Sequence, residues 1–133
     1  MIRNQTEFNR LTNDVRDVWI ANFPVSKQNS LMLYQQQSIK NLTIGSNALN
    51  GVSVLELIEM GALERLVIMR GGLSGGTGRL RVTKCVNLRI IDIGDYVFMN
   101  NRNLEMADLT RLEIIRIGNK AFQMVHSVLI KSK

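Results

Sequence analysis

Residues 88–98 read Leu-Arg-Ile-Ile-Asp-Ile-Gly-Asp-Tyr-Val-Phe, and 24 residues later residues 112–122 read Leu-Glu-Ile-Ile-Arg-Ile-Gly-Asn-Lys-Ala-Phe. The shared frame is L-x-x-I-x-I-G-x-x-A/V-F, and an apolar-x-apolar triplet, such as Leu104-Glu-Met106, follows before the frame begins again. Apolar positions that recur every 20 to 30 residues or so are typical of solenoids, because each unit must stack on its neighbours to bury its apolar face. The frame therefore predicts a repeat solenoid that is mainly β, with parallel sheets.

The frame can be followed through most of the chain as five repeat units behind a short N-terminal segment. The units cover residues 15–38, 39–62, 63–87, 88–111 and 112–133. The third unit is one residue longer than the period, and the additional residue falls in its glycine-rich loop, where an insertion leaves the stacked strands undisturbed. Residues 1–14 are expected to form an N-terminal cap over the open end of the core, because solenoids need covered ends for solubility.

The first repeat unit also admits a second interpretation. Its six expected apolar positions are all apolar, which favours strands over residues 15–34: Val15, Val18, Ile20, Val25, Leu31 and Leu33. Helical spacing is present as well, behind Thr6 as a suitable N-cap, and Pro24 would end such a helix. The residues at helical spacing are Phe8, Leu11, Val15, Val18 and Trp19. The sequence alone leaves helix and strand open for residues 4–20.

Each repeat unit is expected to contribute two short strands. In I-x-I-G the two isoleucines share one face of a strand, and the triplet forms a second strand in the same way. The glycine that follows the first strand permits a positive φ and a tight corner. When equivalent strands stack, their inward residues form rows, of which the clearest are Ile20/Ile44/Ile68/Ile93/Ile117 and Leu33/Leu57/Val82/Met106/Ile130.

Outward charges give independent support for this stacking. Equivalent positions at the start of the first strands hold Lys40, Glu64, Arg89 and Glu113, and equivalent positions of the second strands hold Glu56, Arg81 and Glu105. Opposite charges would then lie on neighbouring strands, where such pairs help to hold the register. No other arrangement of the units requires this alternation.

Three stretches carry the Ile-Gly-x-x-Ala/Val-Phe element most clearly: Ile44-Gly-Ser-Asn-Ala-Leu49, Ile93-Gly-Asp-Tyr-Val-Phe98 and Ile117-Gly-Asn-Lys-Ala-Phe122. Preceded by L-x-x-I-x, this element resembles the BspA-type leucine-rich repeat, and the resemblance covers about residues 15–130. Met69 and Ala21 replace the glycine in the third and first units, where the pattern is weaker. The resemblance implies a leucine-rich-repeat-like interaction scaffold, often part of large multi-repeat proteins on microbial or protist surfaces, and it transfers no catalytic residues.

The amino-acid composition limits the classes of function that the chain can have. With 45% hydrophobic but only 5% aromatic residues, the chain of 133 residues suits a core of aliphatic rows. No apolar run approaches the roughly eighteen residues of a membrane span, and the N-terminus lacks the features of a signal peptide, so a cytoplasmic location is favoured. Cys85 is the only cysteine, takes the frame position of Met60 and Leu109, and is expected to be a small buried hydrophobe. No acid–base pair, partnered nucleophile or metal set converges, so neither an enzyme nor a cofactor is expected.

Two surfaces are candidates for binding. The outward row of the first strands is expected to bind a protein partner, because solenoids use extended sheet faces and because Trp and Arg anchor interfaces. This row consists of Trp19, Thr43, Val67, Asp92 and Arg116. Alternatively, the basic third unit could bind an anion through Arg70, Arg79 and Arg81, which lie around its glycine-rich loop. Nucleic acid is not favoured as a partner, because the excess charge in a net +6 is a local patch rather than a stripe.

The fifth unit reaches Val128-Leu-Ile130 and stops at Lys131-Ser-Lys133 without a polar closure. It is therefore expected to present strand edges and apolar side chains. Truncation of a longer array, pairing with a partner and a tolerated frayed end all agree with this pattern, and end-to-end self-association is one form of pairing. The sequence thus favours a protein-interaction scaffold, with a structural segment of a longer array, or an anion or nucleic-acid binder, as alternatives.

Overall fold

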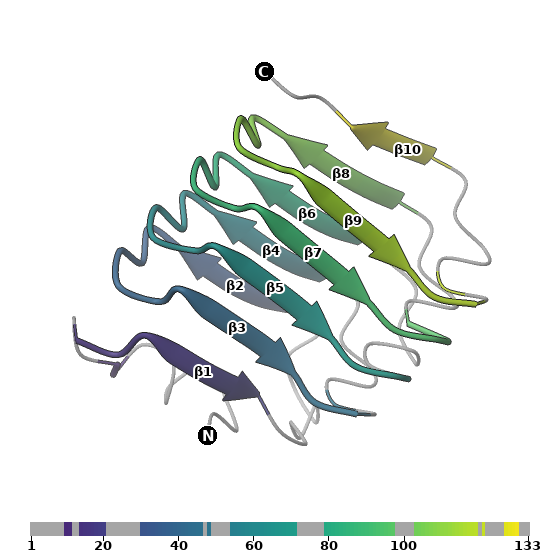
Figure 1. Ribbon diagram of the computed structural model, residues 1–133, viewed down its shortest axis with the longest axis horizontal. Helices are drawn as coiled ribbons and strands as arrows, with labels where there is room; N and C mark the ends of the chain where they lie inside the picture. Colours follow the sequence, from purple (N-terminus) through teal and green to yellow (C-terminus); the bar gives the residue numbers. More distant parts are fainter. Residues whose placement is uncertain are drawn as a thin grey trace.

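The described strands form two parallel sheets of five strands each (Figure 1). The first sheet has the order β1 (Asp17–Ile20), β3 (Asn41–Ile44), β5 (Arg65–Ile68), β7 (Ile90–Ile93) and β9 (Ile114–Ile117). The second has the order β10 (Ser127–Ile130), β8 (Asn103–Ala107), β6 (Arg79–Thr83), β4 (Val54–Ile58) and β2 (Ser30–Tyr34). Each repeat unit contributes one strand to each sheet, and the sheets lie face to face.

The structure is a computed structural model that describes residues 10–11, 14–20, 30–46, 48, 54–71, 79–97, 103–119, 121 and 127–130. For residues 30, 31, 79, 103 and 127–130 the description is confined to the backbone. These ranges contain no helix, and hence none long and apolar enough to cross a membrane. Residues 17–20 form a strand, as the strand interpretation of the first unit requires, whereas residues 4–9 and 12–13 lie outside the described residues. The prediction of a mainly β chain with parallel sheets is confirmed.

Strand register confirms that the residues of both predicted rows stack on equivalent positions of neighbouring strands. In the first sheet, successive Cα partners are Ile20, Ile44, Ile68, Ile93 and Ile117. In the second sheet, they are Leu33, Leu57, Val82, Met106 and Ile130. A shift of one residue in either sheet would turn the inward side chains outward, so the apolar alternation fixes the register.

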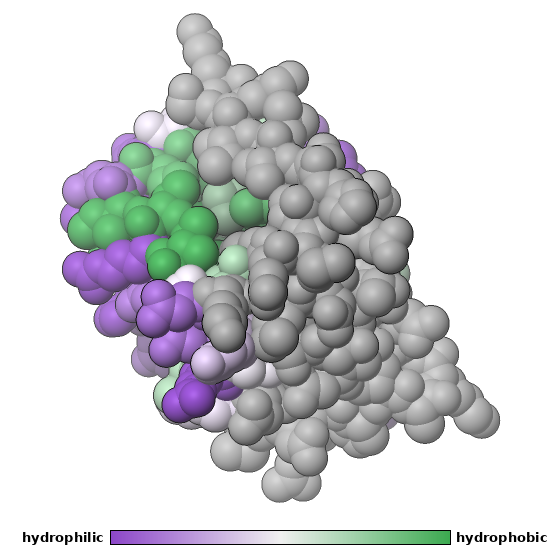
Figure 2. Space-filling model, turned by 90° about the vertical axis from the view of Figure 1, so that its right-hand side faces the viewer, coloured by the Kyte–Doolittle hydropathy of each residue, from purple (hydrophilic) through white to green (hydrophobic). Residues whose placement is uncertain are grey.

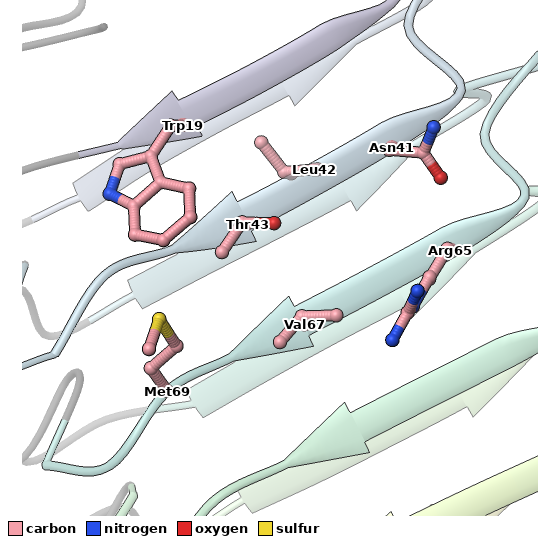
Figure 3. A pocket seen from close by; sticks show the side chains of 7 residues that line it. All are labelled: Trp19, Asn41, Leu42, Thr43, Arg65, Val67 and Met69. Atoms are coloured by element: carbon pink, nitrogen blue, oxygen red, sulfur yellow. The ribbon is translucent and has the colours of Figure 1, made fainter.

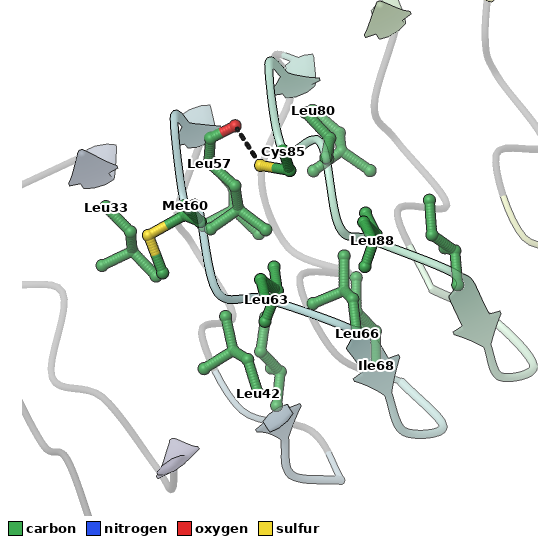
Figure 4. Packing of buried hydrophobic residues seen from close by; sticks show 14 of the residues in the cluster. Leu33, Leu42, Leu57, Met60, Leu63, Leu66, Ile68, Leu80, Cys85 and Leu88 are labelled. Atoms are coloured by element: carbon green, nitrogen blue, oxygen red, sulfur yellow. Dashed lines mark hydrogen bonds between the residues drawn. The ribbon is translucent and has the colours of Figure 1, made fainter. Parts of the chain in front are cut away.

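The inward side chains of the two sheets meet in one core (Figure 4). Leu42 and Leu57 from the strands, and Leu63 and Leu88 from the segments that connect them, are all fully buried. Burial of such a side chain contributes about 2 kcal/mol relative to leaving it exposed. Cys85 is fully buried among them, as predicted, and this burial raises the pKa of its thiol to about 11.

The glycines that follow the first strands do not use the positive φ that glycine permits, as Gly45, Gly94 and Gly118 show. They provide space instead, because each corner lies close against the preceding unit. A Cβ atom on Gly94 would come within 2.9 Å of the backbone nitrogen of Arg70 and 3.2 Å of the carbonyl oxygen of Ile68. Glycine permits this close approach of two backbones because it lacks a side chain.

Positive φ occurs at other positions: at Gly71 and Tyr96, in the corners after β5 and β7, and directly after the second strands. Gln35, Glu59, Lys84 and Asp108 hold equivalent frame positions, and all four have positive φ. The N–H groups of the first three donate hydrogen bonds to carbonyl oxygens of the next unit, for example from Glu59 to Thr83 at 3.1 Å. These bonds between units offset the cost, about 1–2 kcal/mol, of a left-handed residue other than glycine.

Among the charges that directly precede the first strands, two of the three predicted pairs form across neighbouring units. Lys40 Nζ lies 3.8 Å from Glu64 Oε2, and Arg89 Nε donates a hydrogen bond of 2.6 Å to Glu113 Oε2. That hydrogen bond, and then the charge of Arg89, lower the pKa of Glu113. Both pairs are exposed to solvent, so they specify register more than they add stability.

Candidate partner-binding groove on the first sheet

The outward row predicted from the sequence lies in register across the first sheet. Trp19 is the Cα partner of Thr43, and the row continues through Val67 and Asp92 to Arg116. Because successive side chains of a strand point to opposite faces, this row lies on the face away from the core, and none of its members is buried. The row divides into two parts with different surroundings.

The N-terminal part of the row lines a groove on the outer face of the first sheet (Figure 3). The groove has a volume of about 320 Å³ and is lined by Trp19, Asn41, Leu42, Thr43, Arg65, Val67 and Met69. Trp19 and Met69 lie toward the carboxyl ends of β1 and β5, whereas Asn41 and Arg65 begin β3 and β5. The groove therefore has an apolar end and a polar end.

Trp19 forms the apolar end, with 47% of its surface exposed. Its indole lies against the backbone at Gly45, where a Cβ atom would come within 2.9 Å of Trp19 Nε1. Glycine at this corner therefore leaves the room that the indole occupies. An aromatic ring supported in this way offers a large contact area while losing little conformational entropy on binding.

The polar end of the groove contains an amide and a guanidinium group. Asn41 Nδ2 donates a hydrogen bond of 2.7 Å to Asp17 Oδ1. Arg65, the Cα partner of Asn41, is exposed, and its guanidinium group makes no hydrogen bond or ion pair with other described residues. Sequence reasoning missed Asn41 and Arg65, although they lie two positions before Thr43 and Val67. The alternation of side chains along a strand would have placed them on the same face.

The C-terminal part of the row does not reach the groove. Arg116 Nη1 lies 3.9 Å from Asp92 Oδ2, so the two side chains form an ion pair between β7 and β9. The structure thus brings together Trp19, Thr43 and Val67 in one site, and places Asp92 and Arg116 beside each other outside it.

The structure describes the side chains of two of the three arginines of the alternative anion site, and both of these side chains contact other residues of the chain. Arg70 Cζ lies 5.3 Å from the centre of the Tyr96 ring, a cation–π contact at the corner of the first sheet. Arg81, in the second sheet, lies 3.2 Å from Glu105 and 3.5 Å from Glu56. The hydrogen bond to Glu105, followed by the charge of that carboxylate, raises the pKa of Arg81. Residues 72–78 and the side chain of Arg79 lie outside the described residues.

Comparison of the chain with protein-family models, with curated proteins and with solved structures gave no match. Within the part of the chain that the structure describes, no three His, Cys, Asp or Glu side chains are grouped so that they could hold a metal ion. The geometry and chemistry of the groove are therefore the basis for a functional proposal.

Proposed function

We propose that the chain is a non-enzymatic protein-interaction module, built as a leucine-rich-repeat-like solenoid, that binds a partner protein in the groove on the first sheet. The observation that carries the proposal is the exposed Trp19 in the same groove as Arg65, whose guanidinium group has no partner among the described residues. Tryptophan and arginine are the residues that most often supply binding energy at protein interfaces. The stacked strands of successive repeat units, together with the Ile-Gly-x-x-Ala/Val-Phe element, support the leucine-rich-repeat-like architecture.

The two ends of the groove define the chemistry of the partner. Trp19, Val67 and Met69 offer an apolar surface on which an aliphatic or aromatic side chain can be buried. Arg65, at the other end, can pair with a carboxylate, with two of the three nitrogens of the guanidinium group donating hydrogen bonds. The partner is therefore a protein segment that carries an apolar side chain and an acidic residue a short distance apart.

A protein partner fits this surface better than nucleic acid does. Affinity for nucleic acid comes from several cations that follow the phosphate backbone. The groove contains one cation, Arg65, and Asp17 lies at its polar end, hydrogen-bonded to Asn41. In the third unit, Arg81 already lies between two carboxylates. Among the described residues, Arg65 is therefore the single cation that lines the groove.

Photo-cross-linking from inside the groove tests this proposal. A photoreactive amino acid in place of Thr43 is expected to capture a protein from a lysate of the source cells, whereas the same amino acid in place of Val86 is not. Addition of Trp19→Ala or Arg65→Glu to the Thr43 probe is expected to reduce capture about tenfold or more. Met32→Ala is the matched control, because Met32 is an exposed apolar residue of the second sheet.

The outcomes separate the competing functions. Capture that is lost in both groove variants and retained with Met32→Ala supports the proposal. Equal capture by all of the variants would contradict it and favour a structural segment of a longer array. Binding to anions or nucleic acid that falls steeply with salt, and is lost in Arg70→Glu, would favour the basic third unit instead.

A further inference from the structure

A second concavity adjoins the polar end of the groove, at the amino-terminal rim of the first sheet. This rim pocket has a volume of about 360 Å³, and the residues that line it are Glu64, Asn87, Arg89 and Arg111. Glu64 directly precedes Arg65, the groove residue with which β5 begins. Arg89 directly precedes Ile90, the Cα partner of Arg65. The groove and the rim pocket therefore meet at the amino ends of β5 and β7.

Two of the three charges that line the rim pocket are compensated within the chain. Glu64 Oε2 lies 3.8 Å from Lys40 Nζ, and Arg89 Nε donates its hydrogen bond of 2.6 Å to Glu113 Oε2. Arg111 differs from them. It is exposed, and its guanidinium group makes no hydrogen bond or ion pair with the other residues that the structure describes. Like the groove, the rim pocket thus offers one cation that can pair with a carboxylate from outside the chain.

Trp19 and these two available cations lie along one diagonal of the first sheet. From Trp19 to Arg65 the diagonal crosses two strand spacings and shifts by two residues toward the amino ends. Ile114 is in register with Arg65 through Ile90, so the step from Arg65 to Arg111 crosses two more spacings and shifts by three residues in the same direction. With strands about 4.8 Å apart and a rise of about 3.3 Å per residue, the Cα atoms are separated by about 12 Å and then about 14 Å. An extended segment covers each step in about four residues.

We infer that the protein segment bound in the groove carries two acidic residues, the second of which pairs with Arg111 in the rim pocket. This inference rests on the proposed function and extends it. An apolar side chain packs on Trp19, an acidic residue about four positions away pairs with Arg65, and a second about four positions farther pairs with Arg111. Asn87 Nδ2 donates a hydrogen bond of 2.6 Å to the carbonyl oxygen of Gly61, which orients Asn87 Oδ1 as an acceptor for a backbone N–H group of the segment.

The charges along this diagonal favour carboxylates at two separate places. Glu64 and Glu113 each have a cation beside them, so they repel an approaching carboxylate less than an uncompensated charge would. Apolar and charged groups are also separated elsewhere on the molecule, as Figure 2 shows, where hydrophobic residues gather in one area of the coloured surface and hydrophilic residues border it. A segment with one acidic residue would leave Arg111 in water, and would therefore bind more weakly than a segment with two.

Selection of peptides by the full chain tests the inference. The probe is a library of random peptides of about sixteen residues displayed on phage, long enough to span both steps of the diagonal. The wild type is expected to enrich peptides with one apolar and two acidic residues at successive spacings of about four. Selection with Trp19→Ala is expected to lose these peptides. Selection with Arg111→Gln is expected to keep the apolar residue and the first acidic residue, and to lose the preference for the second.

A double-mutant cycle with the most enriched peptide isolates the contact at Arg111. Trp19 is the only tryptophan of the chain and lies in the groove, so its fluorescence measures the dissociation constant. Arg111→Gln, or glutamine in place of the second acidic residue of the peptide, is expected to weaken binding about fivefold, and both changes together no further. Arg16→Gln is the matched control, because Arg16 is an exposed arginine of the same rim that lies off the diagonal. This control is expected to leave the affinity within about twofold of the wild type.

Failure of this inference can be told apart from failure of the proposed function. Enriched peptides that carry a single acidic residue, or an affinity that Arg111→Gln does not change, would overturn the inference. Binding that depends on Trp19 and Arg65 would then still support the groove. If no enriched peptide requires Trp19, the proposed function and the inference are both overturned.

Discussion

The outer faces of the two sheets use one repeat frame in different ways. On the second sheet, the outward polar groups satisfy one another. Tyr34 Oη donates a hydrogen bond of 2.6 Å to Glu56 Oε1, and Arg81 joins Glu56 to Glu105 on the next strand. Glu56 is only 8% exposed, yet both the hydroxyl group and the guanidinium group compensate its charge. This face is thus held together by its own side chains.

On the first sheet, the outward groups near the N-terminus are left available. Trp19 is half exposed, and Arg65 is not compensated by any described residue. The Asp92–Arg116 pair farther along the same face shows that the frame can place opposite charges on adjacent strands here too. The comparison indicates that an outward row contributes to the fold where its charges are compensated, and is available to a partner where they are not.

The largest expected effect comes from removing one outward cation from each sheet, Arg81 from the second and Arg65 from the first, and comparing the losses of stability. Arg81→Met leaves the nearly buried Glu56 and the half-buried Glu105 without their cation, and is expected to lower the free energy of unfolding by about 2 kcal/mol. Arg65→Met removes no side-chain hydrogen bond or ion pair with the described residues and is expected to change the free energy of unfolding by less than about 0.5 kcal/mol. Urea denaturation followed by circular dichroism measures both. An equal loss of the free energy of unfolding in the two variants would mean that outward charges contribute equally to the fold on both sheets.

Removal of the hydroxyl group of Tyr34 is expected to have a smaller effect. Tyr34→Phe takes the hydrogen-bond donor from Glu56 and keeps the ring, so it is expected to cost about 1 kcal/mol of the free energy of unfolding. Trp19→Phe, a matched aromatic change on the first sheet, is expected to cost less and to weaken partner binding instead. The same urea titrations test this pair. A larger loss for Trp19→Phe than for Tyr34→Phe would mean that Trp19 supports the fold rather than a partner.

Most of the scaffold could be predicted, because residues at equivalent positions of the repeat frame are the ones that pair between neighbouring strands. Once Ile44, Ile68 and Ile93 are aligned by the frame, parallel stacking follows, and so does the pairing of Lys40 with Glu64. These features depend only on which residues occupy equivalent positions. Alternation of apolar and polar residues then decides which face each one occupies.

The candidate site was predictable only in part, because it depends on contacts between units. Asp92 and Arg116 were expected to bind a partner, but their adjacency in the frame lets them compensate each other, as it does for Lys40 and Glu64. The role of Gly45 was missed for a similar reason. Within one unit it is a corner residue, and only stacking brings the Trp19 indole against it.

Filling the space at Gly45 is expected to disturb the groove more than the fold. In Gly45→Ala the added methyl group meets the indole, a side chain that can move, and comes within 3.2 Å of the carbonyl oxygen of Ile20, so the free energy of unfolding is expected to fall by about 1 kcal/mol. Trp19 is the only tryptophan of the chain, so its fluorescence reports the displacement, and emission is expected to shift to longer wavelength. Gly61→Ala, where the added atom meets the Gln37 side chain, is the matched control. An unchanged Trp19 spectrum in Gly45→Ala would show that the indole is not held at this corner.

The smallest expected effect concerns the exposed Arg89–Glu113 pair of the first sheet. Because Arg89 lowers the pKa of Glu113 below its ordinary value of 4.5, the folded state binds this proton less readily than the unfolded chain does. The stabilisation is therefore present above about pH 4.5 and is lost as the pH falls through the folded pKa. NMR titration of the Glu113 carboxyl carbon is expected to give a midpoint below 4.5 that rises toward this value in Arg89→Gln. Salt at about 0.5 M is expected to raise the wild-type midpoint in the same direction, because exposed charges are screened. A midpoint that responds to neither change would mean that the pair does not persist in solution. The charges of the first sheet outside the groove would then lack a lasting partner, as the guanidinium group of Arg65 does. An unpaired charge would no longer distinguish the groove from the rest of this face.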